Sequence, residues 1–237
     1  MENNINKLLE NIIKNTNLIK PDDIPNIDLY MDQVTTFMDK HLHSVKRFDD
    51  DKALTKTMIN NYAKNNLLPS PEKKKYTKEH VLLLTFIYYY KNVLSISDIK
   101  KLLQPITDKY FHCNLDTELV DIYNEIDRLL DNIGDAVSDD IAQKIEISAT
   151  SFDNIHSKDK DYLQLFSLVS MLCFDIYIKK QLVEAIVDTL EEPISKSDKE
   201  KIAKKEYEER EKLARKEREE REKLLRKERE KREKFKK

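Results

Sequence analysis

The chain has 237 residues, a formal net charge of −2 and a single glycine, Gly134. One glycine excludes a P-loop, a dinucleotide fingerprint and a nucleophile elbow, because each needs two or more glycines for positive φ or close backbone approach. The two cysteines, Cys113 and Cys173, form neither a disulfide framework nor a metal-ligand motif, so we expect a cytoplasmic protein.

Two helices are predicted before the middle of the chain. Residues 3–14 place apolar side chains at helical spacing and form an amphipathic helix. Pro21 and Pro25 then break the chain, so residues 1–24 form this helix and a linker. A second helix is predicted over 28–42. Its buried side would consist of Met31, Val34, Phe37 and Met38.

Two further helices follow within a segment that we delimit as residues 25–107. Thr55 is placed to act as the N-cap of a helix over 55–65. Thr77 is placed to cap the next helix, over 77–91. Its interior is apolar on nearly every side, which predicts the central buried helix of the fold.

Beyond this helix the apolar pattern changes. Ser97 is predicted to start a short helix that ends before Pro105, because proline ends or kinks a helix. Apolar residues then alternate at spacings of four and three over 115–133, as in a coiled-coil seam. This seam could close an intramolecular bundle or form a homodimer. Its members are Leu115, Leu119, Ile122, Ile126, Leu129 and Ile133.

The seam, a short helix over 138–147 and a long helix over 159–190 make up a predicted helical bundle, residues 108–192. The long helix is apolar enough to approach the length of a membrane span. Polar residues such as Gln164 and Asp175 interrupt it, so we predict a core helix and no membrane contact.

The C-terminal segment, residues 193–237, contains an eleven-residue repeat over 201–233. Regular apolar positions occur only once in each repeat, which is too sparse for a coiled-coil seam. Glutamates stand four residues before lysines or arginines throughout the repeat, and each such pair stabilises a helix by a few tenths of a kcal/mol. We therefore predict a long, solitary, charged helix.

Residues 54–87 resemble the helix-turn-helix and wing of MerR-type regulators, which read roughly T-I-R-Y-Y, then G-L-L-x-P, then a basic wing. The residues that carry this resemblance are Met58, Ile59, Asn60, Asn61 and Tyr62, then Asn66, Leu67, Leu68 and Pro69, then the wing Lys73–Tyr76. The wider segment 25–190 resembles an uncharacterised bacterial domain-of-unknown-function family whose members are regarded as transcriptional regulators. The resemblance implies a MerR-like winged helix-turn-helix in an all-α protein. Two features depart from it: the arginine expected near Asn60 is absent, and the loop before Thr55 is longer than in a tight helix-turn-helix.

The charge distribution is consistent with this resemblance. Residues 52–101 carry ten lysines and a net charge of +7, within an acidic segment 1–195 whose net charge is −9. Asparagine can pair with adenine and threonine can touch a thymine methyl group, whereas lysine meets phosphates. The predicted DNA-binding residues are Lys56, Thr57, Asn60, Asn61, Lys64, Lys73, Lys74 and Lys75.

The sequence thus predicts a regulator, more specifically a repressor, that binds double-stranded DNA. A homodimer is expected by analogy with MerR-type regulators, which dimerise through helices that follow the DNA-binding domain. We expect no enzymatic activity, no catalytic residues, no cofactor and no metal site, and the sequence does not identify an effector ligand. The alternative is a helical adaptor that binds another protein and uses the charged tail as a spacer.

Overall fold

The computed structural model describes residues 2–113, 116–154, 158–191 and 204. They are mostly helical, which confirms the predicted all-α class. The elements are α1 (Glu2–Asn15), the 3₁₀ helix η1 (Pro21–Asp23), β1 (Leu29–Tyr30), α2 (Met31–His41), the 3₁₀ helix η2 (His43–Val45), α3 (Lys56–Lys64), β2 (Lys75–Tyr76), α4 (Lys78–Tyr90), α5 (Ile96–Tyr110), α6 (Leu119–Leu130), α7 (Ile133–Ala149) and α8 (Lys160–Asp188).

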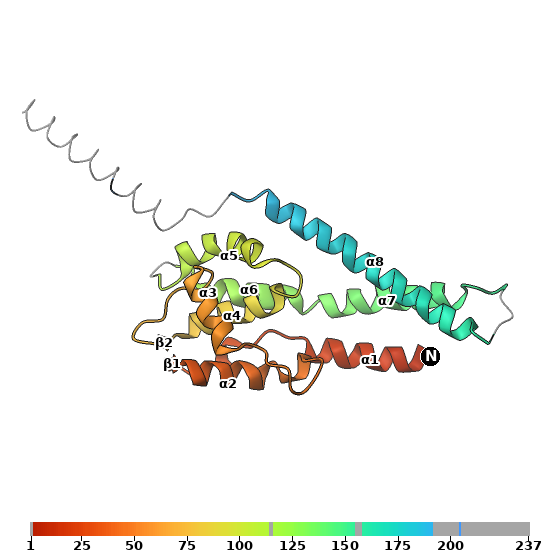
Figure 1. Cartoon of the computed structure of the whole chain (residues 1–237), viewed down its shortest axis with the longest axis horizontal. Coiled ribbons are helices and arrows are strands. Elements are labelled where there is room, and N and C mark those ends of the chain that lie inside the picture. The colour runs from red at the N-terminus through yellow and green to blue at the C-terminus, as the bar shows by residue number, and fades with distance from the viewer. Residues whose placement is uncertain (1, 114–115, 155–157, 192–203, 205–237) are drawn as a thin grey trace, which may run out of the picture. The chain divides into compact units, whose positions relative to one another are not determined.

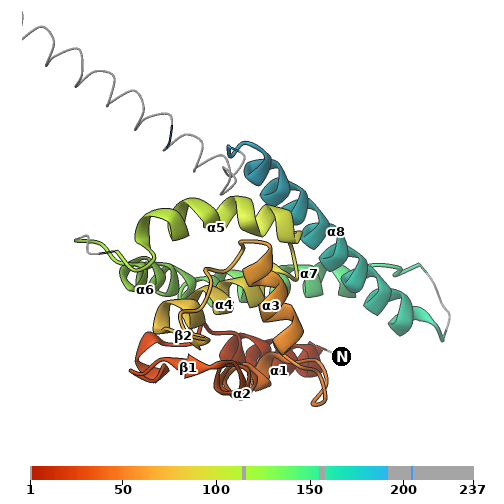
Figure 2. The same cartoon turned by 60° about the vertical axis from the view of Figure 1, so that its left-hand side comes forward.

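Helix α4 is the centre of the core, as its apolar sequence predicts. In two views it lies between α2 with the strands on one side and α5 with α6 on the other (Figures 1 and 2). Its residues from His80 to Tyr88 are all buried. Thr77 is its N-cap, and the side chain of His80 takes the acceptor position that Glu or Gln usually fills in a capping box. Burial on every side explains why this helix lacks a polar face.

Strands β1 and β2 form a short antiparallel pair that holds the predicted wing against the helices. Leu29 is paired with Tyr76, and Tyr30 is paired with Lys75. Leu29 and Tyr76 are buried in the core cluster. The sheet is limited to these two residues in each strand and packs beside α2.

Helix α5 differs from its predicted bounds at both ends. Its N-cap is Ser95, whose hydroxyl accepts a hydrogen bond from the backbone amide of Asp98, so the helix begins before Ser97. It also continues through Pro105 to Tyr110. A proline inside a helix costs about 3 kcal/mol, because one hydrogen bond is lost and the ring crowds the preceding turn. Contacts with the core on both sides of the proline offset this cost; they come from Ile99, Leu102, Leu103 and Ile106.

The seam predicted over 115–133 is wrong as a continuous feature. Helix α6 ends at Leu130 and the chain turns before α7 begins at Ile133. Leu119 is buried, but Leu129 and Ile133 are each 50% exposed. The core residue that the pattern missed is Tyr123, which is fully buried and donates a hydrogen bond to the carbonyl oxygen of Ile19 (2.8 Å). Leu115 lies outside the described residues, and α7 is longer than the predicted helix 138–147.

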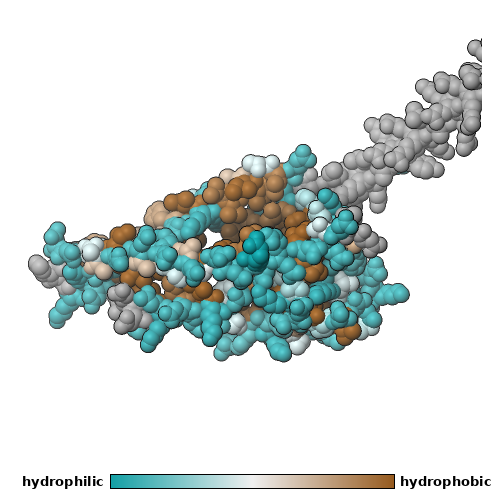
Figure 3. Space-filling view, turned by 180° about the vertical axis from the view of Figure 1, so that it is seen from behind, coloured by the Kyte–Doolittle hydropathy of each residue, from teal (hydrophilic) through white to brown (hydrophobic). Residues whose placement is uncertain are grey.

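Helix α8 is not the core helix that was predicted. Within the described residues only Leu168 and Val187 of this helix are buried. Most of its large apolar side chains are exposed, and Figure 3 shows hydrophobic side chains gathered along the upper edge of the molecule, where α8 runs. By its length and composition alone this helix is long and apolar enough to cross a membrane. The core helices of soluble proteins can meet the same two criteria. Its apolar surface is thus left uncovered within the described residues.

The chain divides into two units, Met1–Glu191 and Glu192–Lys237. The first unit contains all the elements described above. The solitary helix predicted for residues 193–237 lies outside the described residues, apart from the exposed helical residue Lys204.

Candidate nucleic-acid interface

Helix α3 is fixed in place at both ends by local hydrogen bonds. The hydroxyl of Thr55 accepts a hydrogen bond from the backbone amide of Met58 (3.2 Å), as predicted for an N-cap. At the other end Asn66 adopts a left-handed conformation (φ 55°), and the backbone amides of Leu67 and Leu68 donate to the carbonyl oxygen of Tyr62. Such an arrangement satisfies carbonyl groups that would otherwise lack partners at a helix C-terminus.

One side of α3 is buried and the other is exposed. Ile59 and Tyr62 pack into the core, and Met58 contacts it. Five of the predicted DNA-binding residues lie together on the exposed side, hereafter the α3 face. They are Lys56, Thr57, Asn60, Asn61 and Lys64. The structure thus brings together on one surface the side chains that the sequence singled out for base and phosphate contacts.

Lys56 forms an ion pair with α2, in which its ammonium group contacts the carboxylate of Asp32. Both side chains are largely exposed, so this pair contributes little to stability. The sequence pattern does not indicate that Asp32 is the partner of Lys56. The carboxylate of Asp32 lowers the net positive charge at the start of the α3 face.

The long loop between α2 and α3 is held by a polar network. The carboxylate of Asp39 accepts a hydrogen bond from the backbone amide of Ala53 (3.3 Å) and pairs with the ammonium group of Lys46 (2.7 Å). The side chain of Lys46 is only 4% exposed, and Lys91, the C-cap residue of α4, donates to the carbonyl oxygen of Ala53 (2.8 Å). Lys46 and Ala53 also hold the pKa of Asp39 below its usual range. The loop is longer than in a tight helix-turn-helix, but these contacts attach it to α2 and α4.

The wing ends in a tight turn over Glu72–Lys75, closed by a hydrogen bond from the amide of Lys75 to the carbonyl oxygen of Glu72 (2.8 Å). Lys73 (φ 48°) and Lys74 (φ 65°) both occupy the left-handed region, and both are exposed. Lys75 is placed differently: it is half-buried, and its ammonium group lies 5.5 Å from the ring centre of Tyr30. Of the three predicted wing lysines, two therefore project at the tip and one packs against β1.

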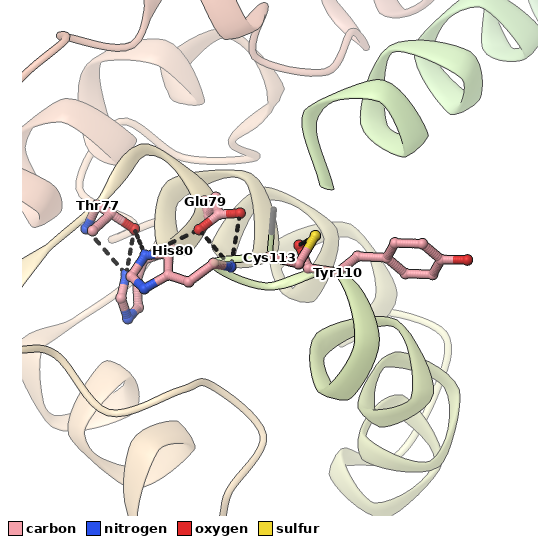
Figure 4. A network of polar contacts seen from close by, with 6 residues as sticks. Thr77, Glu79, His80, Tyr110 and Cys113 are labelled. Carbon is pink, nitrogen blue, oxygen red and sulfur yellow. Dashed lines mark hydrogen bonds and ion pairs between the residues drawn. The ribbon is translucent and has the colours of Figure 1, made fainter. Parts of the chain in front are cut away.

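A network that sequence reasoning missed fixes the start of α4 (Figure 4). The carboxylate of Glu79 accepts hydrogen bonds from the backbone amide of His112 and lies 3.0 Å from its Nε2 atom. The Nε2 atom of His112 also lies 3.2 Å from the hydroxyl of Thr77. These partners are more than thirty residues apart in sequence, so no local pattern could have indicated them.

His80 lies inside this network and is 1% exposed. Its Nδ1 atom accepts a hydrogen bond from the backbone amide of Thr77 (3.0 Å), and its Nε2 atom has no hydrogen-bond partner among the described residues. Burial, together with the nearby His112, lowers the pKa of His80 to about 4. This histidine is therefore neutral at physiological pH and acts in the packing of α4.

A shallow hollow of about 450 Å³ adjoins the first turn of α3. Its lining combines hydroxyl groups of Thr35, Thr36 and Thr55 with the carboxylate of Asp39 and the side chains of three lysines. The lysines are Lys40, Lys52 and Lys56. Among the described residues, no group of three His, Cys, Asp or Glu side chains is placed to hold a metal ion.

Comparison with known proteins finds one match to a family model. Residues 19–126 match the family model of a domain of unknown function, DUF1836, and this segment includes the α3 face, the wing and α4. A search of curated proteins and a search of solved structures each found no match. No comparison matches a MerR-type regulator, so that finer resemblance stays a prediction.

Proposed function

We propose that this protein is a sequence-specific DNA-binding regulator of the cytoplasm that acts as a repressor through a MerR-like winged helix-turn-helix. In this proposal α3 enters the major groove and its face reads base edges. Asn60 and Asn61 are suited to adenine, and Thr57 to a thymine methyl group. Occupancy of a promoter is sufficient for repression, so a separate activation domain is not required.

The observation that carries the proposal is the conformation of the wing tip. In two-residue turns of this kind Asn-Gly is strongly preferred, because both central residues have positive φ. Lys73 and Lys74 occupy these positions here and are exposed. Left-handed conformations cost non-glycine residues about 1–2 kcal/mol each. Strained residues at a surface point to a function that needs them, and two adjacent cations at a tip fit phosphate contacts.

The flanks of the α3 face support the same proposal. The hollow beside α3 presents lysines at positions 40, 52 and 56, and Lys64 lies at the end of the helix. Phosphates on either side of a groove would meet these cations while α3 contacts the bases. The network of Asp39, Lys46 and Lys91 would hold α2 and α3 in one orientation against the DNA.

We place the homodimer contact on α8 rather than on the seam. Residues 174, 178, 182 and 186 form a ridge of Phe, Ile, Leu and Ile at every fourth position, each 55–70% exposed. Such ridges pack into the grooves of an equivalent helix, which gives a self-complementary contact about a twofold axis. The ion pairs of Asp175 with Lys144 and Lys179 lie beside this ridge and favour a protein partner over a bilayer.

The experiment begins with a genomic pull-down, which tests DNA binding and supplies a cognate duplex. Binding of the parent and of a Lys73→Asn/Lys74→Gly variant to that duplex is then measured at several salt concentrations. The variant turn is conformationally easier and should be at least as stable, but it lacks two charges. Its plot of log K against log salt should flatten by about 0.9 for each phosphate that is no longer neutralised, so by about two units.

Two controls make the result decisive. A Lys7→Ala/Lys14→Ala variant removes the same charge from exposed positions of α1 and should leave the slope unchanged. Asn60→Ala should weaken cognate binding by about 1–3 kcal/mol with little change in slope, because it removes a base contact. Folded variants of Asn60 and of the wing that bind like the parent would refute the proposal. The exposed α8 surface would then favour the adaptor function.

A further inference from the structure

A second cavity, of about 430 Å³, lies away from the α3 face, between α1, α4, α6 and α7. Each helix contributes an apolar wall: Ile13 from α1, Phe86 from α4, Ile126 from α6 and Val137 from α7. Cavities of about 300–1,000 Å³ with mostly apolar walls and a few polar groups are typical of small-molecule sites.

Specific contacts fix the walls of this cavity. The hydroxyl of Tyr89 donates to the carbonyl oxygen of Asn17 (2.7 Å), which ties the segment after α1 to α4. The only glycine of the chain, Gly134, faces α1: a Cβ atom at this position would lie 2.8 Å from Cγ2 of Ile13. A side chain at position 134 would therefore force Ile13 or one of the two helices to shift.

The polar groups of the lining define the chemistry of a ligand. Tyr90 lines the cavity, and its hydroxyl has no hydrogen-bond partner among the described residues. Asp131, which is exposed at the edge of the cavity, is the one charged residue among those that line it in the described part of the chain. A carboxylate at an apolar site disfavours an anionic ligand and favours a neutral or cationic one.

From this geometry we infer that the cavity binds a small, mostly apolar molecule that is neutral or positively charged and carries one group able to hydrogen-bond to Tyr90. This ligand site is separate from the proposed DNA contacts, since none of its lining residues belongs to α3 or the wing. Its occupancy can therefore be tested on the full-length protein without DNA.

Two fluorescent probes with the same aromatic framework test the inference. N-phenyl-1-naphthylamine is neutral, and 8-anilino-1-naphthalenesulfonate adds an anionic group to it. We expect saturable binding of the neutral probe, with one site per chain, and severalfold weaker binding of the sulfonate at that site, because an exposed carboxylate acts through solvent. Asp131→Asn should reduce this discrimination, because it removes the repelling charge.

A matched pair of variants separates the cavity from the exposed apolar surface of α8. Val137→Phe fills part of the cavity and should weaken binding of the neutral probe tenfold or more. Ala136→Phe adds the same ring at an exposed neighbouring position of α7 and should leave binding unchanged. Leu130→Phe, at a half-open lining position, serves as a second filling variant if Val137→Phe does not fold. Parent-like affinity in a folded filling variant, or equal affinity for both probes, would overturn the inference.

Discussion

Replacement of His80 should make the stability of the fold less sensitive to acid. The pKa of His80 is about 4 in the folded protein and 6.5 in an unfolded chain. The unfolded state therefore takes up a proton first as the pH falls. Titration of His80 therefore does not lower the free energy of unfolding above pH 6.5. It lowers the free energy of unfolding as the pH falls from 6.5 to about 4.

The size of the effect follows from the two pKa values. One pKa unit corresponds to about 1.4 kcal/mol, so the loss of stability at pH 4 is about 3 kcal/mol. At pH 5 the loss is about 2 kcal/mol relative to neutral pH. His80→Gln keeps an acceptor for the backbone amide of Thr77, since Gln is a usual residue at this capping position, and removes the titrating group.

Urea unfolding of the parent and of His80→Gln at pH 7.5 and pH 5 measures the difference. The parent should lose about 2 kcal/mol more than the variant between the two pH values. His43→Gln, at an exposed histidine, is the control and should lose as much as the parent. An identical pH dependence in parent and His80→Gln would show that burial does not keep this histidine neutral.

Three other changes have expected outcomes. Tyr123→Phe leaves the carbonyl group of Ile19 unpaired and should lower the free energy of unfolding by about 1–2 kcal/mol in urea; an unchanged value would contradict the buried bond. Ile178→Asp should give a monomer in sedimentation velocity, whereas Ile176→Asp, equally exposed on the opposite side of α8, should leave a dimer; two dimers would refute the α8 contact. A chain ending at Ser195 should keep specific DNA binding but bind random duplexes more weakly, because it lacks a segment of net charge +7; loss of specificity would assign the tail a direct role.

Elements with strong local signals were predictable from the sequence. Thr55 and Thr77 cap α3 and α4 as expected, because a cap depends on residues within one turn. The two sides of α3 follow from helical periodicity, so Ile59 is buried and Asn60 is exposed. This is why periodicity alone could place five of the candidate site residues together.

Features that depend on distant contacts were not predictable. The pairing of β1 with β2 joins residues far apart in sequence, and Glu79 meets His112 only after α4 and α5 have packed. Tyr123 was missed because its burial depends on the segment around Ile19. Helix α8 shows a different error, because it was predicted to be buried and is largely exposed. An apolar composition favours burial of a helix but does not identify the surface that would bury it.

The bond between Tyr123 and Ile19 also has a consequence for biosynthesis. It joins residues 104 positions apart, near the two ends of the segment that matches the DUF1836 family model. During translation α2, α3 and α4 leave the ribosome before α6, so the leucines of α4 have an incomplete core until α6 emerges. The nascent chain should therefore present this apolar helix to chaperones for most of the time needed to synthesise the domain, and fold late rather than helix by helix.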